Sequence, residues 1–148
     1  MISLNYFKKY KIIILLLGVS MYFTAFNSYE LRTRPEPWLA PTTANDKKNP
    51  LKENVSATIE GGKLYLKYCT SCHGSKGKGN GIGSSGLQTK PADHTSNKVQ
   101  NQSDGAIFWK ISEGRKPMPP YKAALTELQI WQLVNFIRTL AKPIKNKM

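Results

Sequence analysis

The amino-acid sequence predicts a small all-α domain in the second half of the chain. Three stretches, 58–69, 103–114 and 126–140, carry apolar residues at the spacings of three and four that share one face of a helix. No stretch shows the apolar and polar alternation of a half-buried strand. At 148 residues, the chain has room for one such domain and additional segments.

Changes in composition divide the chain into four parts. Residues 1–27 form an apolar leader, 28–57 a polar linker with several prolines, 58–142 the helical domain and 143–148 a basic tail. A domain of about 85 residues buries little surface, so we expect its core to need support from elsewhere.

The first two predicted helices have clear limits. The first covers 58–69 (TIEGGKLYLKYC), with Tyr65 on its apolar face. The second follows Ser103, a residue type that caps helix N-termini, and has Asp104 in its first turn. Gly114 ends it. The apolar stripe of the second helix consists of Ile107, Phe108 and Ile111.

The last helix has the strongest signal. Thr126 and Gln129 have the spacing of a capping box, and Pro143 ends the helix. The basic residues that follow lie where cations favour the helix dipole. One apolar stripe consists of Ile130, Leu133, Val134, Ile137 and Leu140.

The leader has the order of an export signal. Three lysines precede an apolar run over 12–26 (IIILLLGVSMYFTAF). Small residues at positions −3 and −1 of a cleavage site occur only at Gly18 and Ser20, where cleavage would leave a very short apolar core. We therefore expect 12–26 to remain as a membrane anchor, although removal as a signal peptide stays open. As a helix, this run spans roughly 22 Å of a ~30 Å hydrocarbon core, and flanking aromatic residues could extend it.

The stretch 28–57 has the composition of a linker. It is polar, and Pro35, Pro37, Pro41 and Pro50 interrupt it. A coil of about 30 residues reaches roughly 30 Å, enough for an anchored domain to sample partners in the same membrane. The alternative is that Trp38 and Leu39 dock on the domain or on a neighbouring subunit.

Both cysteines of the chain lie in one five-residue motif, Cys69-Thr70-Ser71-Cys72-His73. This spacing is the attachment signature of a c-type haem. Two thiols separated by two residues can form thioethers with both vinyl groups of one porphyrin. The imidazole of His73 can then bind the iron from the proximal side.

Two other sites compete with haem attachment. A disulfide between Cys69 and Cys72 would close a very small loop, and the strand-to-helix setting of a thioredoxin-like motif is missing. A zinc site would need four ligands, and the chain offers only these two cysteines, His73 and His94. Cys72 and His73 are adjacent and cannot easily occupy two corners of one tetrahedron.

The stretch 74–86 (GSKGKGNGIGSSG) is rich in glycine. Gly81, Gly83 and Gly86 satisfy the G-x-G-x-x-G pattern, but no strand precedes it and no helix clearly follows, so a dinucleotide site is not expected. A loop that crosses the haem edge explains the glycines better, because backbone close to a flat ring leaves little room for side chains.

Met118 is the candidate for the second axial ligand. It is the only methionine of the helical domain, and Pro117 and Pro119 restrict its backbone on both sides. A thioether in the sixth position keeps haem iron low-spin and raises its potential. The alternatives are that Met118 is an ordinary packing residue, and that His94 is the ligand rather than a surface residue on a polar loop.

Over about 58–141, the chain resembles the class I cytochrome c family in the order of its features. These are a first helix, Cys-x-x-Cys-His-Gly, a glycine loop, a short helix, a Met-Pro segment and an amphipathic last helix. Gly62-x-x-Tyr65-x-x-x-Cys69 resembles its first-helix pattern, and Phe136-Ile137-Arg138-x-Leu140 its last. The resemblance implies three to four short helices around one covalently attached haem.

The resemblance also implies contacts within the domain. Gly62 would let the first helix cross the last closely, against Phe136. Pro91 would lie on the proximal side, where a backbone carbonyl accepts the free N–H of His73 and so orients the imidazole. We expect one haem c bound through Cys69 and Cys72, with His73 and Met118 as the iron ligands.

The expected function is one-electron transfer rather than catalysis, because both axial positions are filled by protein and no paired carboxylates are visible. Expected partners are redox proteins such as a quinol-oxidising complex, a terminal oxidase or a periplasmic dehydrogenase, together with the membrane. The net charge of +13 is spread along the chain without a recognition helix, so nucleic acid is not expected. The residues expected to steer acidic partners are Lys76, Lys78, Lys110, Arg115 and Lys116.

Two other functions stay open. The chain could be a permanently docked haem subunit of a respiratory or dehydrogenase complex, with 28–57 as the contact. It could also be a haem enzyme or gas sensor, if Met118 dissociates from the iron.

Overall fold

The computed structural model describes residues 10–22 and 36–141, which belong to two separate units, Met1–Trp38 and Leu39–Met148. In the first unit, residues 10–22 are helical and their large apolar side chains are exposed. No helix within these described ranges is long and apolar enough to cross a membrane. The rest of the expected anchor, Lys8 and Lys9 before it, and the basic tail lie outside the described residues.

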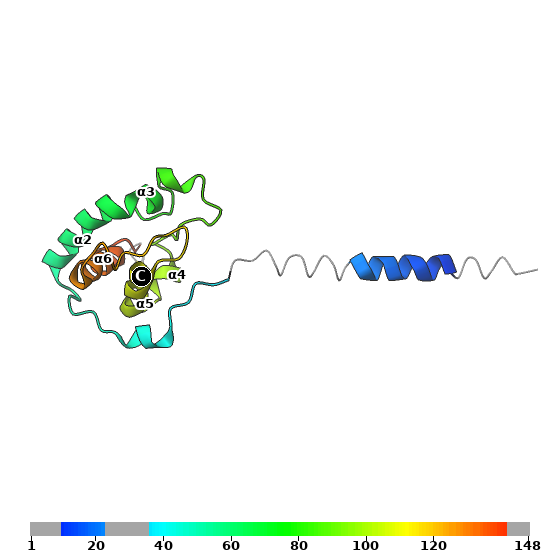
Figure 1. Ribbon diagram of the computed structural model, residues 1–148, viewed down its shortest axis with the longest axis horizontal. Helices are drawn as coiled ribbons and strands as arrows, with labels where there is room; N and C mark the ends of the chain where they lie inside the picture. The colour runs from blue at the N-terminus through cyan, green and yellow to red at the C-terminus, as the bar shows by residue number, and fades with distance from the viewer. Residues whose placement is uncertain (1–9, 23–35, 142–148) are drawn as a thin grey trace, which may run out of the picture. The chain divides into compact units, whose positions relative to one another are not determined.

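The second unit is built from short helices (Figure 1). Within 36–141 there is no strand, and the only bridge of β type is an isolated one between Arg115 and Met118. The all-α prediction is therefore confirmed. The elements are η1 (Thr42–Asp46), α2 (Val55–Tyr68), α3 (Thr70–His73), η2 (Ile82–Ser84), α4 (Asn97–Gln100), α5 (Asp104–Glu113) and α6 (Glu127–Thr139).

Helix α2 begins three residues before the predicted start. Asn54 caps it, because the side-chain oxygen of Asn54 accepts a hydrogen bond from the backbone N–H of Ala57 at 2.9 Å. The helix ends at Tyr68, and Cys69 forms both its C-cap and the N-cap of α3.

Helices α2 and α6 cross in close contact, as Figure 1 shows. A Cβ atom at Gly61 would clash with the backbone carbonyl oxygen of Gln132. A Cβ atom at Gly62 would lie 3.1 Å from the ring of Phe136. The contact between Gly62 and Phe136 is as expected. The tightest point of the crossing, however, is its neighbour Gly61.

The capping predictions for α5 and α6 are correct. The Ser103 side chain accepts from the Ala106 N–H at 3.0 Å, and Thr126 and Gln129 form the reciprocal capping box. The stripes of these helices enter one core with α2, in which Tyr65, Leu133 and Val134 are fully buried. Burial of such side chains stabilises a fold by about 1.5–3 kcal/mol each.

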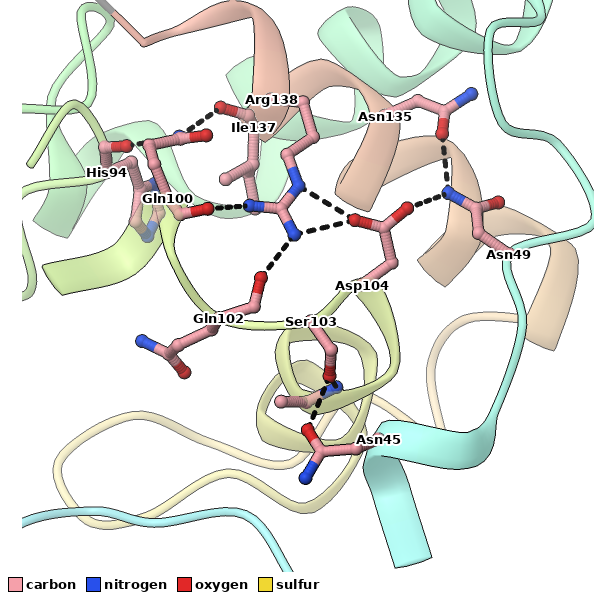
Figure 2. A network of polar contacts seen from close by, with 11 residues as sticks. Asn45, Asn49, His94, Gln100, Gln102, Ser103, Asp104, Asn135, Ile137 and Arg138 are labelled. Carbon is pink, nitrogen blue, oxygen red and sulfur yellow. Dashed lines mark hydrogen bonds and ion pairs between the residues drawn. The ribbon is translucent and has the colours of Figure 1, made fainter. Parts of the chain in front are cut away.

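Part of the expected linker is folded onto the domain. Ala44 of η1 is buried. Its backbone carbonyl packs so closely on Gly105 that a Cβ atom at Gly105 would clash with it. The Asn49 side chain donates to Asp104 at 2.9 Å and to Asn135 at 2.8 Å (Figure 2). The sequence alone does not reveal these contacts, because asparagine is as typical of loops as of buried hydrogen bonds. Leu39 is 78% exposed and is therefore not buried against the domain.

Arg138 anchors the centre of this polar network. Its guanidinium donates to Asp104 at 2.7 Å and to the carbonyls of Gln100 and Gln102 at 2.7 and 2.5 Å (Figure 2). Asp104 is therefore bonded on one side to α6 and on the other to Asn49. This network joins the start of α5, the end of α6 and the segment before α2.

Candidate functional site

The cysteine motif lies at the junction of α2 and α3. The N–H of Cys72 donates to the carbonyl of Cys69 at 3.2 Å, and the N–H of His73 to the same carbonyl at 2.9 Å. These bonds make one helical turn of the motif, so that Cys69, Cys72 and His73 are held by local backbone geometry. Both cysteines are free and partly exposed, whereas His73 is buried.

The ring of His73 is oriented by a backbone carbonyl. Its Nδ1 lies 3.0 Å from the carbonyl oxygen of Ala92. A carbonyl can only accept, so Nδ1 carries the proton and the neutral ring keeps a lone pair on Nε2. Burial lowers the pKa of His73, which favours this neutral form. An imidazole with one N–H bonded to a carbonyl is the usual form of a metal ligand.

The backbone carbonyl that accepts from His73 belongs to Ala92, directly after Pro91. Ala92 accepts from His73, whereas the carbonyl of Pro91 faces Gly79. Gly79 has φ of 71°, and a Cβ there would collide with the Pro91 oxygen. Backbone conformation and the neighbouring Pro91 carbonyl therefore both require glycine at this position.

The loop after His73 folds back on the motif. Gly79 N–H donates to the His73 carbonyl at 2.8 Å and Gly81 N–H to the Cys72 carbonyl at 3.0 Å. The following η2 lies beside Cys72, since a Cβ at Gly83 would lie 3.8 Å from the Cys72 sulfur. On η2, Ile82 is 92% exposed. An apolar side chain is thus presented to solvent next to the cysteine motif.

The competing zinc and disulfide sites find no support. The two cysteines are not bonded to each other. Across residues 10–22 and 36–141, no three His, Cys, Asp or Glu side chains gather as a metal-binding group. Burial, and secondarily Cys72, raises the pKa of Cys69 to about 12, so this thiol is not poised as a thiolate for redox exchange.

Met118 lies on a loop that is closed by two backbone hydrogen bonds. Arg115 N–H donates to the Met118 carbonyl at 3.0 Å, and Met118 N–H to the Arg115 carbonyl at 2.9 Å. The Met118 side chain is partly buried against the core. The loop exit is tied to the motif, because the Tyr121 hydroxyl donates to the Tyr68 carbonyl, one residue before Cys69, at 2.9 Å.

His94 is half-buried, and its ring lies against the face of His73 rather than opposite it, as the alternative of a distal ligand would require. Its ring stacks on His73, with centroids 4.1 Å apart and planes 19° apart. Two imidazoles that share one iron would meet it from opposite sides, end to end, and a face-to-face stack has no room for a metal between them. Nothing in the local sequence signals this position, because backbone bonds to distant residues determine it.

The comparisons with known proteins agree with this site. Residues 56–137, more than half of the chain, match the family described as cytochrome C oxidase, cbb3-type, subunit III. The chain belongs to this cytochrome c family. As a c-type cytochrome domain it carries covalently bound haem c and serves electron transfer, not catalysis.

Two solved structures illustrate the similarity of this chain to known proteins. The c-type cytochrome KustC0563 is 34% identical, with a TM-score of 0.49, over 55% of this chain and 98% of that one. A chain of the Kuenenia stuttgartiensis reducing HAO-like protein complex Kustc0457/Kustc0458 is 26% identical, with a TM-score of 0.58, over 76% of this chain and 54% of that chain. No curated protein matches the sequence.

The residues of this cytochrome domain fit haem c. Two free thiols one helical turn apart can form the thioethers, and the imidazole that follows them has its N–H engaged and its other nitrogen available. Bound haem supplies an iron centre that takes up and releases one electron. The protein supplies the covalent attachment, the proximal nitrogen and the packing around them.

Proposed function

We propose that this cytochrome is a one-electron carrier in a respiratory or periplasmic redox chain. The observation that carries the proposal is the neutral His73, buried directly after two free cysteines, with Nδ1 bonded to Ala92. Cys69 and Cys72 would attach one haem, and His73 and Met118 would be the ligands of its iron. With both ligands supplied by side chains, the site would exclude substrates and support electron transfer.

A potentiometric titration with optical detection tests this function. The expected result is one reversible one-electron transition, together with no carbon monoxide binding to the reduced protein. Rapid carbon monoxide binding by the native protein would contradict a closed site and favour a gas sensor or haem enzyme.

We place the protein in the bacterial cell envelope, with the domain facing the periplasm and residues 12–26 as an inner-membrane anchor. The apolar sequence of this run supports the proposal, as does helix formation at 10–22. Fractionation of cells that express the full chain tests it. An intact N-terminus in the membrane fraction is expected, whereas a shortened chain in the soluble periplasmic extract would show that the leader is cleaved.

We propose that redox partners dock near the cysteine motif. Ile82 offers an exposed apolar contact there, and Lys76 and Lys78 are exposed on the neighbouring loop. Arg115 and Lys116 are also exposed. An apolar contact within a basic surface suits an acidic protein such as a subunit of a quinol-oxidising complex, a terminal oxidase or a dehydrogenase.

A permanently docked haem subunit is the second candidate. It is supported by the matched family, which is described as an oxidase subunit, and by the similar chain from a reducing HAO-like complex. Purification of the full chain in mild detergent distinguishes the two functions. A free carrier elutes alone at moderate salt, whereas a docked subunit elutes with stoichiometric partner chains.

A further inference from the structure

The ring of His94 covers one face of the proposed proximal ligand. Its centroid is 4.1 Å from that of His73, and the planes differ by 19°. At this separation, two flat rings are in van der Waals contact over their faces. His73 therefore cannot tilt or turn its ring toward that side unless His94 moves as well.

His94 is itself fixed by backbone and side-chain bonds. Its N–H donates to the Gly77 carbonyl at 2.7 Å, and its carbonyl accepts from the Gln100 side chain at 2.6 Å (Figure 2). Its ring Nδ1 is hydrogen-bonded to the Tyr65 hydroxyl at 3.0 Å. The Tyr65 ring is fully buried, so the bond connects His94 to the core of the domain.

We propose that His94 is a positioning residue that holds the imidazole plane of His73 in one orientation about the axis through its ligating nitrogen. The inference rests on the proposed ligation of iron by His73. The Ala92 carbonyl holds one atom of the ring, Nδ1, and one hydrogen bond leaves the ring free to tilt about it. The stacked ring of His94 removes that freedom, because it supports the whole face.

The orientation of an axial imidazole has a direct spectroscopic signature. It sets how the ligand π orbitals overlap the iron d orbitals, and the g values of the low-spin ferric protein change with it. The reduction potential responds to the same ligand interaction. A role in packing alone would alter stability and leave the g values unchanged.

The test compares haem-loaded full-length variants by electron paramagnetic resonance and redox titration. His94→Leu keeps apolar bulk without a flat ring, and we expect shifted g values and a shifted potential. His94→Phe restores a flat ring without Nδ1, and we expect values close to the native ones. Val99→Ala, a buried truncation on α4, is the control and should lower the melting temperature with native g values.

Native g values in His94→Leu, or equal shifts in the Leu and Phe variants, would overturn the inference. If His94→Leu does not fold, Tyr65→Phe serves instead, because it removes the hydrogen bond from the Tyr65 hydroxyl to His94. We expect a smaller shift of the g values in this variant. Native g values in Tyr65→Phe would then count against the proposal. Pyridine haemochrome spectra separate the two proposals, because a native protein without covalent haem overturns the proposed function as well.

Discussion

At the scale of single residues, the two proposed iron ligands are held in different ways. His73 is fixed by its own helical turn and by the Ala92 carbonyl. Met118 depends on a short loop whose ends are joined by two backbone bonds, and on the Tyr121 hydroxyl bond to Tyr68. We therefore expect that Met118 can be replaced without loss of haem attachment.

Replacement of Met118 therefore separates ligation from attachment. Met118→Ala should lose the sulfur-to-iron charge-transfer band at the red end of the oxidised spectrum, and its reduced form should bind carbon monoxide. Haem content should stay at the native level, because Cys69, Cys72 and His73 are unchanged. Met118→His is the matched control, since it should keep the site closed and lower the potential. A native charge-transfer band in Met118→Ala would show that another residue is the ligand.

Sequence spacing predicts the cysteines and His73 because their geometry is local. One helical turn brings them together, whatever the rest of the chain does. The position of His94 depends instead on its bond to the Gly77 carbonyl and on Gln100, whose side chain also donates to the carbonyl of Ile137 on α6. Long-range contacts of this kind leave no periodic pattern in the sequence.

At the scale of helices, the crossing of α2 and α6 organises the domain. Gly61 is buried where the backbone of Gln132 passes, and Gly62 faces the more adaptable ring of Phe136. A backbone carbonyl cannot move aside without shifting α6, whereas a ring can rotate.

Alanine substitutions at the two glycines should differ accordingly. Gly61→Ala should lower the free energy of unfolding by about 3 kcal/mol, and Gly62→Ala by about 1 kcal/mol or less. For a domain of this size, 1 kcal/mol corresponds to about 4–8 °C in melting temperature. Thermal unfolding followed by circular dichroism measures the difference. Equal melting temperatures in the two variants would contradict this crossing geometry.

Helix limits were predictable where the caps are local. Ser103 and the Thr126 and Gln129 box start their helices as expected. The start of α2 was missed because Asn54 lies in a polar stretch that resembles a linker. Helix α4 was missed because its four residues are too short for a periodic signal.

The segment before α2 is also joined to α6 by an ion pair. The Lys47 Nζ lies 2.8 Å from the Glu127 Oε1 and 4.1 Å from the centroid of the Phe108 ring. The bond from Lys47 lowers the pKa of Glu127 below its ordinary value of 4.5. Above about pH 4.5 the ion pair therefore stabilises the folded state. This contribution to the free energy of unfolding is lost as the pH falls through the lowered pKa of Glu127.

Glu127→Gln should consequently melt slightly below the native protein at neutral pH, and the difference should vanish in acid. The effect is small because both side chains are exposed. Differential scanning calorimetry at several pH values measures it. A difference that persists in strong acid would mean that the charge of Glu127 is not its cause.

At the scale of the whole molecule, net charge governs encounters with partners. The chain carries +13, and the exposed Lys76, Lys78, Arg115 and Lys116 are the proposed steering residues. Lys110 differs from them, because it is half-buried and donates to the Gln102 side chain at 2.5 Å. Burial lowers the pKa of Lys110.

Electron exchange with small charged reagents tests the electrostatic field of these basic residues without a known partner. Oxidation of the reduced protein by anionic hexacyanoferrate should be fast at low salt and slow as salt rises, and cationic hexaammineruthenium should show the opposite trend. Reversal of Lys76 and Lys78 to Glu should lower the hexacyanoferrate rate by about tenfold at low salt. Lys52→Glu, on the segment before α2, is the control. Equal effects of both changes would argue against local steering.

The most direct test of the central claim is the covalent attachment of haem to the motif Cys69-Thr70-Ser71-Cys72-His73. The purified chain is extracted with acidified acetone, and a pyridine haemochrome spectrum is recorded from the protein that remains. We predict one haem c per chain after extraction, and none in the Cys69→Ala, Cys72→Ala double variant. A native chain without haem, or with haem that the solvent removes, would contradict the claim.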